Sequence, residues 1–411
     1  MRHCAAALLL AVSLSATAED WPALFDEATA IVEAQFFDPA MNGLDWPAVT
    51  ASYRQRLEAD MDREAFAALF NELLAELEAS HTRLYTRDEP AWYQLAGVFV
   101  DGYAPLAKAL APWLVDGAPV YHGIGVQLER RAQGWFVTGV LNGFPASEAG
   151  VLLGDRLVSA DGARFHPIRS FAGRAGEGVA LTVERRPGET QTVTVTPAAL
   201  DGRTMFETAM RESTRTVALG SAAIGVIRPW SWAGQRYQDI LVGELLNGSL
   251  RDADALVLDV RGGWGGASPR FLNLFVDRHV EAGSTGRDGT TMSFASGWSR
   301  PVVLLTDERS RSGKELIAHG FRSLGKGPIV GERTAGAVVA GRISALSDGS
   351  LLYVASADVA VDGKRLEGVG VAPDIEVPFD PAFAAGRDIQ LDRAIEIAAG
   401  LVSDTQSSER R

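Results

Sequence analysis

The spacing of apolar residues predicts helices in the first part of the chain. Five apolar side chains recur at intervals of three and four residues: Phe66, Phe70, Leu73, Leu74 and Leu77. They fall on one face of a helix that we predict over residues 62–80, leading directly into His81. Residues 91–120 have a weaker pattern, which predicts further helix or loop without indicating a role.

From residue 121 onward, short alternating runs separated by glycine predict strands. The predicted strands cover residues 124–128, 135–140, 156–159, 179–184 and 190–196. Short strands divided by turn residues are typical of a small β-rich domain. We therefore expect one over residues 121–200, following a helical N-terminal region over residues 19–120.

The remainder of the chain alternates strands with helices. Strands are predicted at residues 222–227, 255–260, 302–305 and 328–330, and helices at 235–246, 270–280 and 315–324. This alternation is typical of an α/β core, which we place at residues 201–401. A β segment (341–361) and a helix (391–401) complete it, and the polar tail over residues 402–411 is expected to be disordered.

Composition and charge narrow the function classes. With 46% hydrophobic and 22% charged residues among 411, the chain is too apolar to be disordered. Its formal net charge is −13, with no run of basic residues, so nucleic acid is not an expected partner. Only four of the 39 basic residues are lysines: Lys108, Lys314, Lys326 and Lys364.

Residues 1–18 resemble a secretory signal peptide. A short positive start is followed by an apolar run and by the small-x-small sequence Ala16-Thr17-Ala18. We expect export to the bacterial periplasm or secretion. The only cysteine, Cys4, would leave with this segment, which excludes a thiol nucleophile. No later apolar stretch reaches the roughly 18 to 20 residues that a bilayer span requires, so no transmembrane segment is expected in the mature chain.

A serine at a predicted strand-to-helix turn is the first candidate for chemistry. A buried strand ends near residue 305, a polar turn follows, and a helix begins near Ser312. Ser312 and Glu315 have the spacing of a capping box, which would be a purely structural role. The same position also suits a nucleophile, because the helix N-terminus and the Gly313 N–H could face an oxyanion. Spacing alone leaves both interpretations open.

A glycine-rich loop favours the catalytic interpretation. The predicted strand that ends in Asp259 is followed by Arg261 and by the glycines of residues 262–266. N–H groups of such a loop can converge on an anion. The spacing fits neither a dinucleotide-binding fingerprint nor a phosphate-binding loop. We therefore predict an oxyanion hole opposite the serine.

The β-rich region resembles a PDZ domain of the type found in bacterial proteases. The resemblance rests on Gly123, Ile124, Gly125 and Val126 at the first strand, on residues 145–151 leading to Gly154-Asp155, and on the Asp161-Gly162 turn. It implies that residues 123–126 bind a peptide through backbone N–H groups at its C-terminal carboxylate. The following strand edge would take the peptide as an added strand.

The order of motifs along the whole chain resembles the tail-specific or C-terminal processing proteases. The motifs are Asp-x-Arg-x-x-x-Gly-Gly from residue 259, Ser-x-Ser-x-x-Glu from residue 310 and Gly-Val-x-Pro-Asp from residue 370. The resemblance implies an α/β core of the ClpP/crotonase-like type and a serine endopeptidase acting on polypeptides, possibly through their C-termini. No metal or other cofactor is implied.

One branch of this family uses a serine-lysine pair, and a tricorn-like branch uses serine, histidine and glutamate. The position matching the lysine is Ala337 here. Lys314, two residues after Ser312 on a helix, points to the opposite side, and Arg333 would stay protonated. A histidine is therefore required as the base.

The resemblance assigns His81 as that base and Glu367 as the acid that orients it. His319 is seven residues from Ser312, about 10 Å along one helix, and is too distant. Asp374 and Glu332 are alternatives to Glu367, and Ser310 is an alternative to Ser312. Gly265 and Gly313 are the expected oxyanion donors. Whether Glu367 reaches His81 directly or through a bridging hydroxyl stays open.

Two other functions remain compatible with these residues. A related fold could carry acyl-CoA chemistry on the glycine loop, although the export signal and PDZ-like region argue against it. The chain could also be a catalytically silent peptide or ligand binder. The sequence predicts neither the natural substrate nor the oligomeric state.

Overall fold

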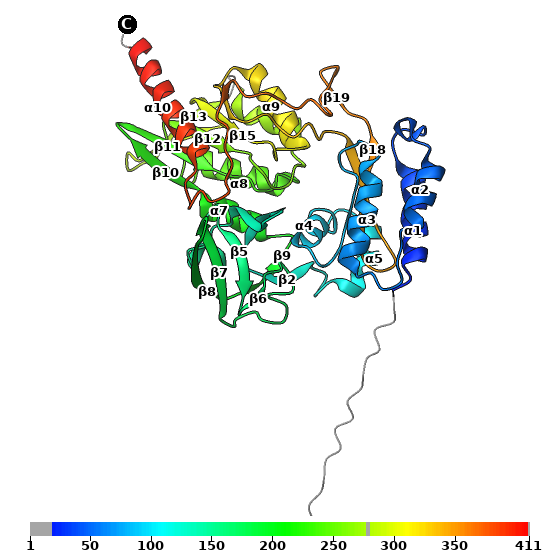
Figure 1. The fold of residues 1–411 in the computed structure, drawn as a ribbon. Coiled ribbons are helices and arrows are strands. Elements are labelled where there is room, and N and C mark those ends of the chain that lie inside the picture. The colour runs from blue at the N-terminus through cyan, green and yellow to red at the C-terminus, as the bar shows by residue number, and fades with distance from the viewer. Residues whose placement is uncertain (1–18, 277–279, 410–411) are drawn as a thin grey trace, which may run out of the picture.

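The computed structural model describes residues 19–276 and 280–409. The predicted signal peptide and His279 lie outside these residues. In Figure 1 the N-terminal helices lie at one side of the molecule. The β-rich module lies at the bottom of that view, and the α/β region lies at the top. Within the described part of the chain, no helix combines the length and the apolar character needed to cross a bilayer.

The N-terminal region is helical, as predicted. Its elements are α1 (Trp21–Gln35), η1 (Met41–Gly43), α2 (Trp46–Arg54), α3 (Arg63–Ala75), β1 (Arg83–Tyr85), α4 (Pro90–Phe99), α5 (Ala104–Leu110) and η2 (Ala111–Trp113). The apolar face of α3 is buried, including Leu77 just beyond its end. The helix nevertheless ends five residues earlier than predicted. Glu78 and His81 take positive φ values of 47° and 54°, which a right-handed helix cannot contain.

Residues 91–120, which the sequence left without a role, form two helices of the central core. Helix α4 buries Trp92 and Leu95, and α5 buries Leu106 and Leu110. These helices therefore connect the N-terminal helices to the central hydrophobic core.

The β-rich module is built from strands close to those predicted. Its elements are β2 (Val120–Gly123), β3 (Val126–Arg131), β4 (Gly134–Val140), α6 (Pro145–Glu148), β5 (Arg156–Ala160), β6 (Ala163–Arg164), β7 (Val179–Arg186), β8 (Glu189–Val195) and β9 (Ala198–Asp201). The main sheet has the order β3-β4-β5-β7-β8. The first predicted strand is divided by Gly125, whose φ is +76°. Strand β3 consequently starts at Val126 and lies at an edge of the sheet.

The α/β region contains a six-stranded sheet of order β10-β11-β12-β15-β16-β21, parallel except for the β10–β11 pair. Its elements are α7 (Met205–Ser213), β10 (Arg215–Leu219), β11 (Ala222–Ile227), α8 (Gln235–Leu246), β12 (Ala255–Asp259), η3 (Pro269–Phe275), β13 (Glu281–Thr285), β14 (Thr291–Ala295), β15 (Val302–Thr306), α9 (Gly313–Leu324), β16 (Ile329–Gly331), β21 (Ile375–Glu376) and α10 (Ile389–Glu409). Side chains of β12 alternate between the two faces. Leu256 and Leu258 pack toward α8 and α9, and Val257 packs toward α10.

Two predictions for this region were wrong. The helix expected at residues 270–280 is a short 3₁₀ helix, η3, which begins at Pro269 and is followed by the β13–β14 hairpin. The tail expected to be disordered from residue 402 continues α10 as far as Glu409. Neither proline nor glycine occurs after Gly400, so nothing in the local sequence ends that helix.

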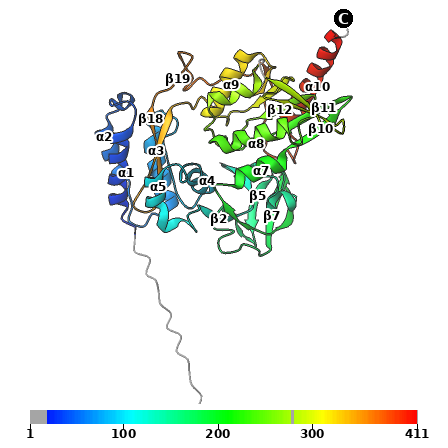
Figure 2. The same cartoon turned by 180° about the vertical axis from the view of Figure 1, so that it is seen from behind.

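A hairpin late in the chain joins the two ends of the sequence. Strands β17 (Ala340–Ala345) and β18 (Leu351–Ala357) pair antiparallel, and β18 also pairs with β1. Figures 1 and 2 both show β18 beside α3, away from the sheet that precedes it in the chain. The small hairpin β19 (Ala360–Val361) and β20 (Lys364–Arg365) follows. This crossing brings residues after 360 near residues around 80.

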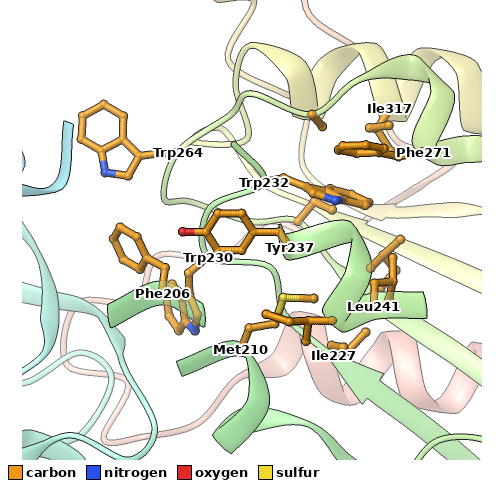
Figure 3. Close-up of a cluster of buried hydrophobic side chains, with 14 of the residues drawn as sticks. Phe206, Met210, Ile227, Trp230, Trp232, Tyr237, Leu241, Trp264, Phe271 and Ile317 are labelled. Atoms are coloured by element: carbon orange, nitrogen blue, oxygen red, sulfur yellow. The ribbon is translucent and has the colours of Figure 1, made fainter. Parts of the chain in front are cut away.

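An aromatic cluster supports the loop that follows β12. Trp230, Trp232 and Tyr237 pack together with residues of α7 and α8 (Figure 3). Trp232 and Tyr237 are 0% and 1% exposed, and each fully buried large side chain stabilises the fold by about 1.5–3 kcal/mol. The carbonyl of Trp230 accepts the Trp264 N–H at 2.9 Å. The cluster thus holds the glycine loop in place through the hydrogen bond between Trp264 and Trp230.

Candidate active site

Ser312 lies at the turn between β15 and α9, at the carboxyl end of the parallel strands. Its φ and ψ are 59° and −129°, a region that costs a non-glycine residue about 1–3 kcal/mol. A strained strand-to-helix turn of this kind exposes the nucleophile in α/β-hydrolases. The strain is held in part by a hydrogen bond from the Ser312 N–H to the Ala337 carbonyl at 2.8 Å.

The alternative nucleophile, Ser310, has a structural role. It is fully buried, and its hydroxyl contacts the Val260 carbonyl at 3.1 Å and Asp307 Oδ1 at 3.0 Å. Asp307 Oδ1 also accepts the Gly262 N–H at 2.9 Å. Ser310 therefore ties the serine turn to the glycine loop and is not available to a substrate.

The predicted capping box is present. Glu315 also accepts hydrogen bonds from a second loop, at residues 334–337. The buried carboxylate accepts the N–H groups of Ser312 at 3.2 Å, Gly336 at 2.7 Å and Ala337 at 2.8 Å. It also accepts the Thr334 hydroxyl at 2.6 Å. Burial raises the pKa of Glu315 against the effect of these hydrogen bonds. The residue clamps the Ser312 turn against the loop in which the lysine branch would carry its lysine.

The glycine loop packs directly against Ser312. A Cβ atom on Gly265 would lie 2.6 Å from Ser312 Cβ, and one on Gly313 would lie 2.2 Å from the Ala267 nitrogen. Only glycine fits at either position. Within residues 19–276 and 280–409, neither the Gly265 N–H nor the Gly313 N–H donates to a loop or turn carbonyl. Gly265 lines the cavity beside Ser312, whereas Gly313 is buried at the start of α9 and does not line it.

Ser312, His81 and Gly265 line one cavity of about 310 Å³. Its other walls come from β1, α4, the glycine loop and β18. The lining includes the aromatic side chains Tyr85, Phe99, Trp264 and Tyr353. A cavity that joins apolar walls with a few convergent polar groups is the usual form of a substrate site. Among the described residues, no group of three or more His, Cys, Asp or Glu side chains could hold a metal ion.

His81 is linked to Glu367 through the hydroxyl of Ser80. Ser80 Oγ lies 3.0 Å from His81 Nδ1 and donates to Glu367 Oε2, also at 3.0 Å. Because a hydroxyl has one proton, donation to Glu367 leaves Oγ to accept from Nδ1–H. This assignment leaves His81 Nε2 unprotonated. The ring packs edge-on to Tyr353, with centroids 5.4 Å apart.

Glu367 is held ionised by its surroundings. Burial favours the neutral acid, but hydrogen bonds from the N–H groups of Val338 (2.7 Å), Ser80 (2.9 Å) and Val339 (3.1 Å) prevail and lower its pKa. The alternatives to Glu367 lie elsewhere: Asp374 accepts the Ile329 N–H at 2.8 Å, and Glu332 contacts Gln390 at 2.8 Å.

Of the four lysines, Lys314 is closest in sequence to Ser312, and it faces away from the cavity as predicted. Its ammonium donates to the carbonyls of Gly262 at 2.7 Å and Trp230 at 3.3 Å. Burial lowers the pKa of Lys314 to about 7. The side chain therefore binds the glycine loop on the side that faces away from the cavity. His319 contacts Asp362 at 3.0 Å, outside the cavity.

The predicted peptide-binding residues lie in the β-rich module and not in this cavity. Gly123 ends β2, and Ile124 is buried in the core of the module. A Cβ on Gly125 would lie 2.3 Å from Phe144 Cβ. Val126 begins the edge strand β3 and lines a second cavity of about 470 Å³ between that strand and α3.

Comparison with known proteins identifies the catalytic region. Residues 223–377 match peptidase family S41, and residues 17–75 match the tricorn protease C1 domain. The chain carries a peptidase domain of family S41. This S41 domain contains Gly265, Ser312, Glu315 and Glu367, whereas Ser80 and His81 come from outside it.

The relatives agree with this assignment. A Streptomyces coelicolor protein described as a putative tricorn protease homolog is 30% identical over 94% of this chain, and the chain spans about a third (33%) of its length. A carboxyl-terminal-processing protease of Picosynechococcus is 23% identical over 93% of the chain and 89% of its own length. The crystal structure of the tricorn protease matches 94% of this chain and 37% of its own, with 19% identity and a TM-score of 0.54. This chain therefore shares its fold with the matched part of that structure.

Three side chains of the cavity were not predicted from the sequence: Ser80, Arg311 and Tyr353. Ser80 could have been found, because a hydroxyl directly before the candidate base can reach its ring. Arg311 and Tyr353 also line the cavity. Arg311 occupies an unspecified position of the Ser-x-Ser-x-x-Glu motif and Tyr353 lies in none of the motifs, so the sequence did not point to either.

Proposed function

We propose that this protein is an exported serine endopeptidase that acts through Ser312, His81 and Glu367. The observation that carries the proposal is the contact chain from Glu367 through Ser80 to His81, ending in the cavity that Ser312 lines. His81 takes the proton of Ser312 as the hydroxyl attacks the scissile carbonyl and returns it to the leaving amine. Glu367 and Ser80 hold the ring and stabilise the imidazolium.

The Gly265 and Gly313 N–H groups are the oxyanion donors of this proposal. Each belongs to a residue packed against the serine turn, and the helix α9 N-terminus adds partial positive charge there. A lysine base is absent because Ala337 occupies its position. The α/β sheet with helices on both faces is the framework we assign to the ClpP/crotonase-like type.

We further assign residues 121–200 to a PDZ domain that captures polypeptide C-termini or gates access. Strand β3 is an edge strand with a cavity along it, as peptide addition to a sheet requires. The side chains of Ile124 and Val126 are buried in the module, so a peptide would be bound through the backbone near Gly125.

The proposal is tested by cleavage of casein with the purified chain and its Ser312→Ala variant. Loss of the hydroxyl should abolish cleavage while the melting temperature stays within a few degrees. Equal cleavage by the variant would exclude Ser312 as the nucleophile. Absence of cleavage by both would favour a silent binding protein.

The Gly265→Ala substitution tests the oxyanion assignment. The added Cβ would lie 2.6 Å from Ser312 Cβ and 2.7 Å from the Arg311 carbonyl, so the loop must move. We expect kcat to fall by about 100-fold or more, the effect of losing one oxyanion donor. Steady-state kinetics on a peptide substrate would measure it, with Gly243→Ala as the control, since no atom lies within 4 Å of a Cβ at that helical position. A kcat within threefold of wild type would contradict the assignment.

The pH dependence of activity tests the state of His81. Burial and then the positive charge of Arg311 lower the pKa of His81 to about 4, and Glu367 opposes them. A base must be unprotonated, so kcat/KM should stay level as the pH falls through about 6.5, the ordinary histidine value. It should decrease only below about pH 5. A midpoint near 6.5, with activity recovered at neutral pH, would contradict this account.

A further inference from the structure

Within residues 19–276 and 280–409, Arg311 is a charged side chain of the active-site cavity that forms no ion pair. Arg311 precedes Ser312, and its guanidinium stacks on the Trp264 ring with its Cζ atom 4.6 Å from the ring centroid. Trp264 is itself fixed, because its indole N–H donates to Oε1 of the buried Gln94 at 3.0 Å. A guanidinium over an aromatic ring keeps its N–H groups for other partners, and no hydrogen bond from the Arg311 guanidinium is found among the described residues.

The cavity contains no acidic side chain to accept those donors. Its lining includes two arginines, Arg83 and Arg311, and neither aspartate nor glutamate. Arg83 is already paired with Glu89 at 2.9 Å. In the part of the chain that the structure describes, no carboxylate forms an ion pair with Arg311. This local positive charge contrasts with a chain in which Asp and Glu outnumber Lys and Arg by 52 to 39.

We propose that the cavity selects substrates by a carboxylate, which Arg311 binds next to the scissile bond. The carboxylate is either an acidic side chain of the polypeptide or the α-carboxylate at its C-terminus. The inference rests on the proposed peptidase function and names the substrate class for that same site. A planar guanidinium binds a carboxylate with two parallel hydrogen bonds, and apolar walls strengthen the attraction.

A bound carboxylate would also assist the chemistry. The charge of Arg311 is the second cause, after burial, of the low pKa of His81. During attack His81 must become positively charged close to that guanidinium. A substrate carboxylate paired with Arg311 offsets this repulsion, so the preference should include an effect on kcat as well as on KM.

The test uses a quenched fluorescent peptide derived from a casein cleavage site of the wild-type protein. One pair of peptides differs by Asp against Asn beside the scissile bond, and a second pair ends shortly after it as the free acid or the amide. We expect one pair to show a 10- to 100-fold preference in kcat/KM for the carboxylate, the range for hydrogen bonds to charged groups. The pair that shows it identifies the source of the carboxylate.

The Arg311→Gln variant should reduce that preference to within about threefold. Arg333→Gln is the matched control, because Arg333 is exposed and contacts only the Val369 carbonyl at 3.2 Å; it should keep the preference. If Arg311→Gln does not fold, Arg311→Lys decides, since it retains the charge and loses the paired hydrogen bonds. Its preference should fall several-fold.

Equal kcat/KM within both peptide pairs in the wild type would overturn the inference, as would an unchanged preference in the folded Arg311 variant. Either result leaves the peptidase function standing. Failure of the proposed function differs, because no peptide would then be cleaved and Ser312→Ala would match the wild type.

Discussion

His81→Ala should lower kcat on a peptide substrate by about 10⁶-fold, with little change in stability. The expected loss is that seen when a member of a serine-histidine-acid triad is removed. It follows here because, among the described residues, the lining of the cavity contains no lysine, no carboxylate and no second histidine that could act as a base for the Ser312 hydroxyl.

His319→Ala is the matched control for that substitution. His319 is a histidine of helix α9, outside the cavity, and it contacts the exposed Asp362. The control should keep kcat within about twofold. Comparable losses in the two variants would mean that the His81 effect is not specific, and a wild-type rate in His81→Ala would exclude it as the base.

Arg261→Met should produce the largest loss of stability among single substitutions near the site. The buried guanidinium binds Asp259 and Asp388, each at 2.7 Å, and Asp259 is 2% exposed. Removing one partner of a buried ion pair costs about 3–5 kcal/mol, because charge is left unpaired. We expect the melting temperature to fall by on the order of 10 °C.

The pH dependence of this loss has a defined sign. Burial raises the pKa of Asp259, but the charges of Arg228 and Arg261 prevail and lower it to about 2. Its contribution is therefore present above the ordinary pKa of an aspartate and is lost as the pH falls toward 2. The difference between wild type and Arg261→Met should shrink over that range. Arg365→Met, at an exposed pair with Asp358, should change stability by less than about 1 kcal/mol; equal losses in both variants would contradict the account.

The α/β core could be predicted because its strands are buried on both faces. Residues 255–260 and 302–305 are nearly continuous apolar runs, and the structure has β12 and β15 there. The local pattern did not predict strand β10, and it did not distinguish helices α4 and α5 from loop. Strand β10 is largely exposed. Helix α4 begins with Pro90 and α5 has Pro105 as its second residue, and the burial of both helices depends on partners distant in the sequence.

The candidate site also has a part that the sequence predicts and a part that depends on distant segments of the chain. Ser312, His81 and Glu367 were placed by motif resemblance, and the structure joins two of them through Ser80. That link requires β1 to pair with β18, some 270 residues later in the chain. Nothing in the local sequence encodes such a pairing. Arg311 likewise depends on a distant residue, because the Trp264 ring beside its guanidinium belongs to a separate loop.

The most direct test of the central claim is the rate at which a fluorophosphonate probe labels Ser312. The probe reacts with a serine only when a neighbouring base activates it. Mass spectrometry of the labelled wild-type chain should find the adduct on Ser312, and His81→Ala should slow labelling at least 100-fold while Ser310 stays unmodified. Labelling of Ser310, or of Ser312 at the same rate with and without His81, would contradict the proposed mechanism.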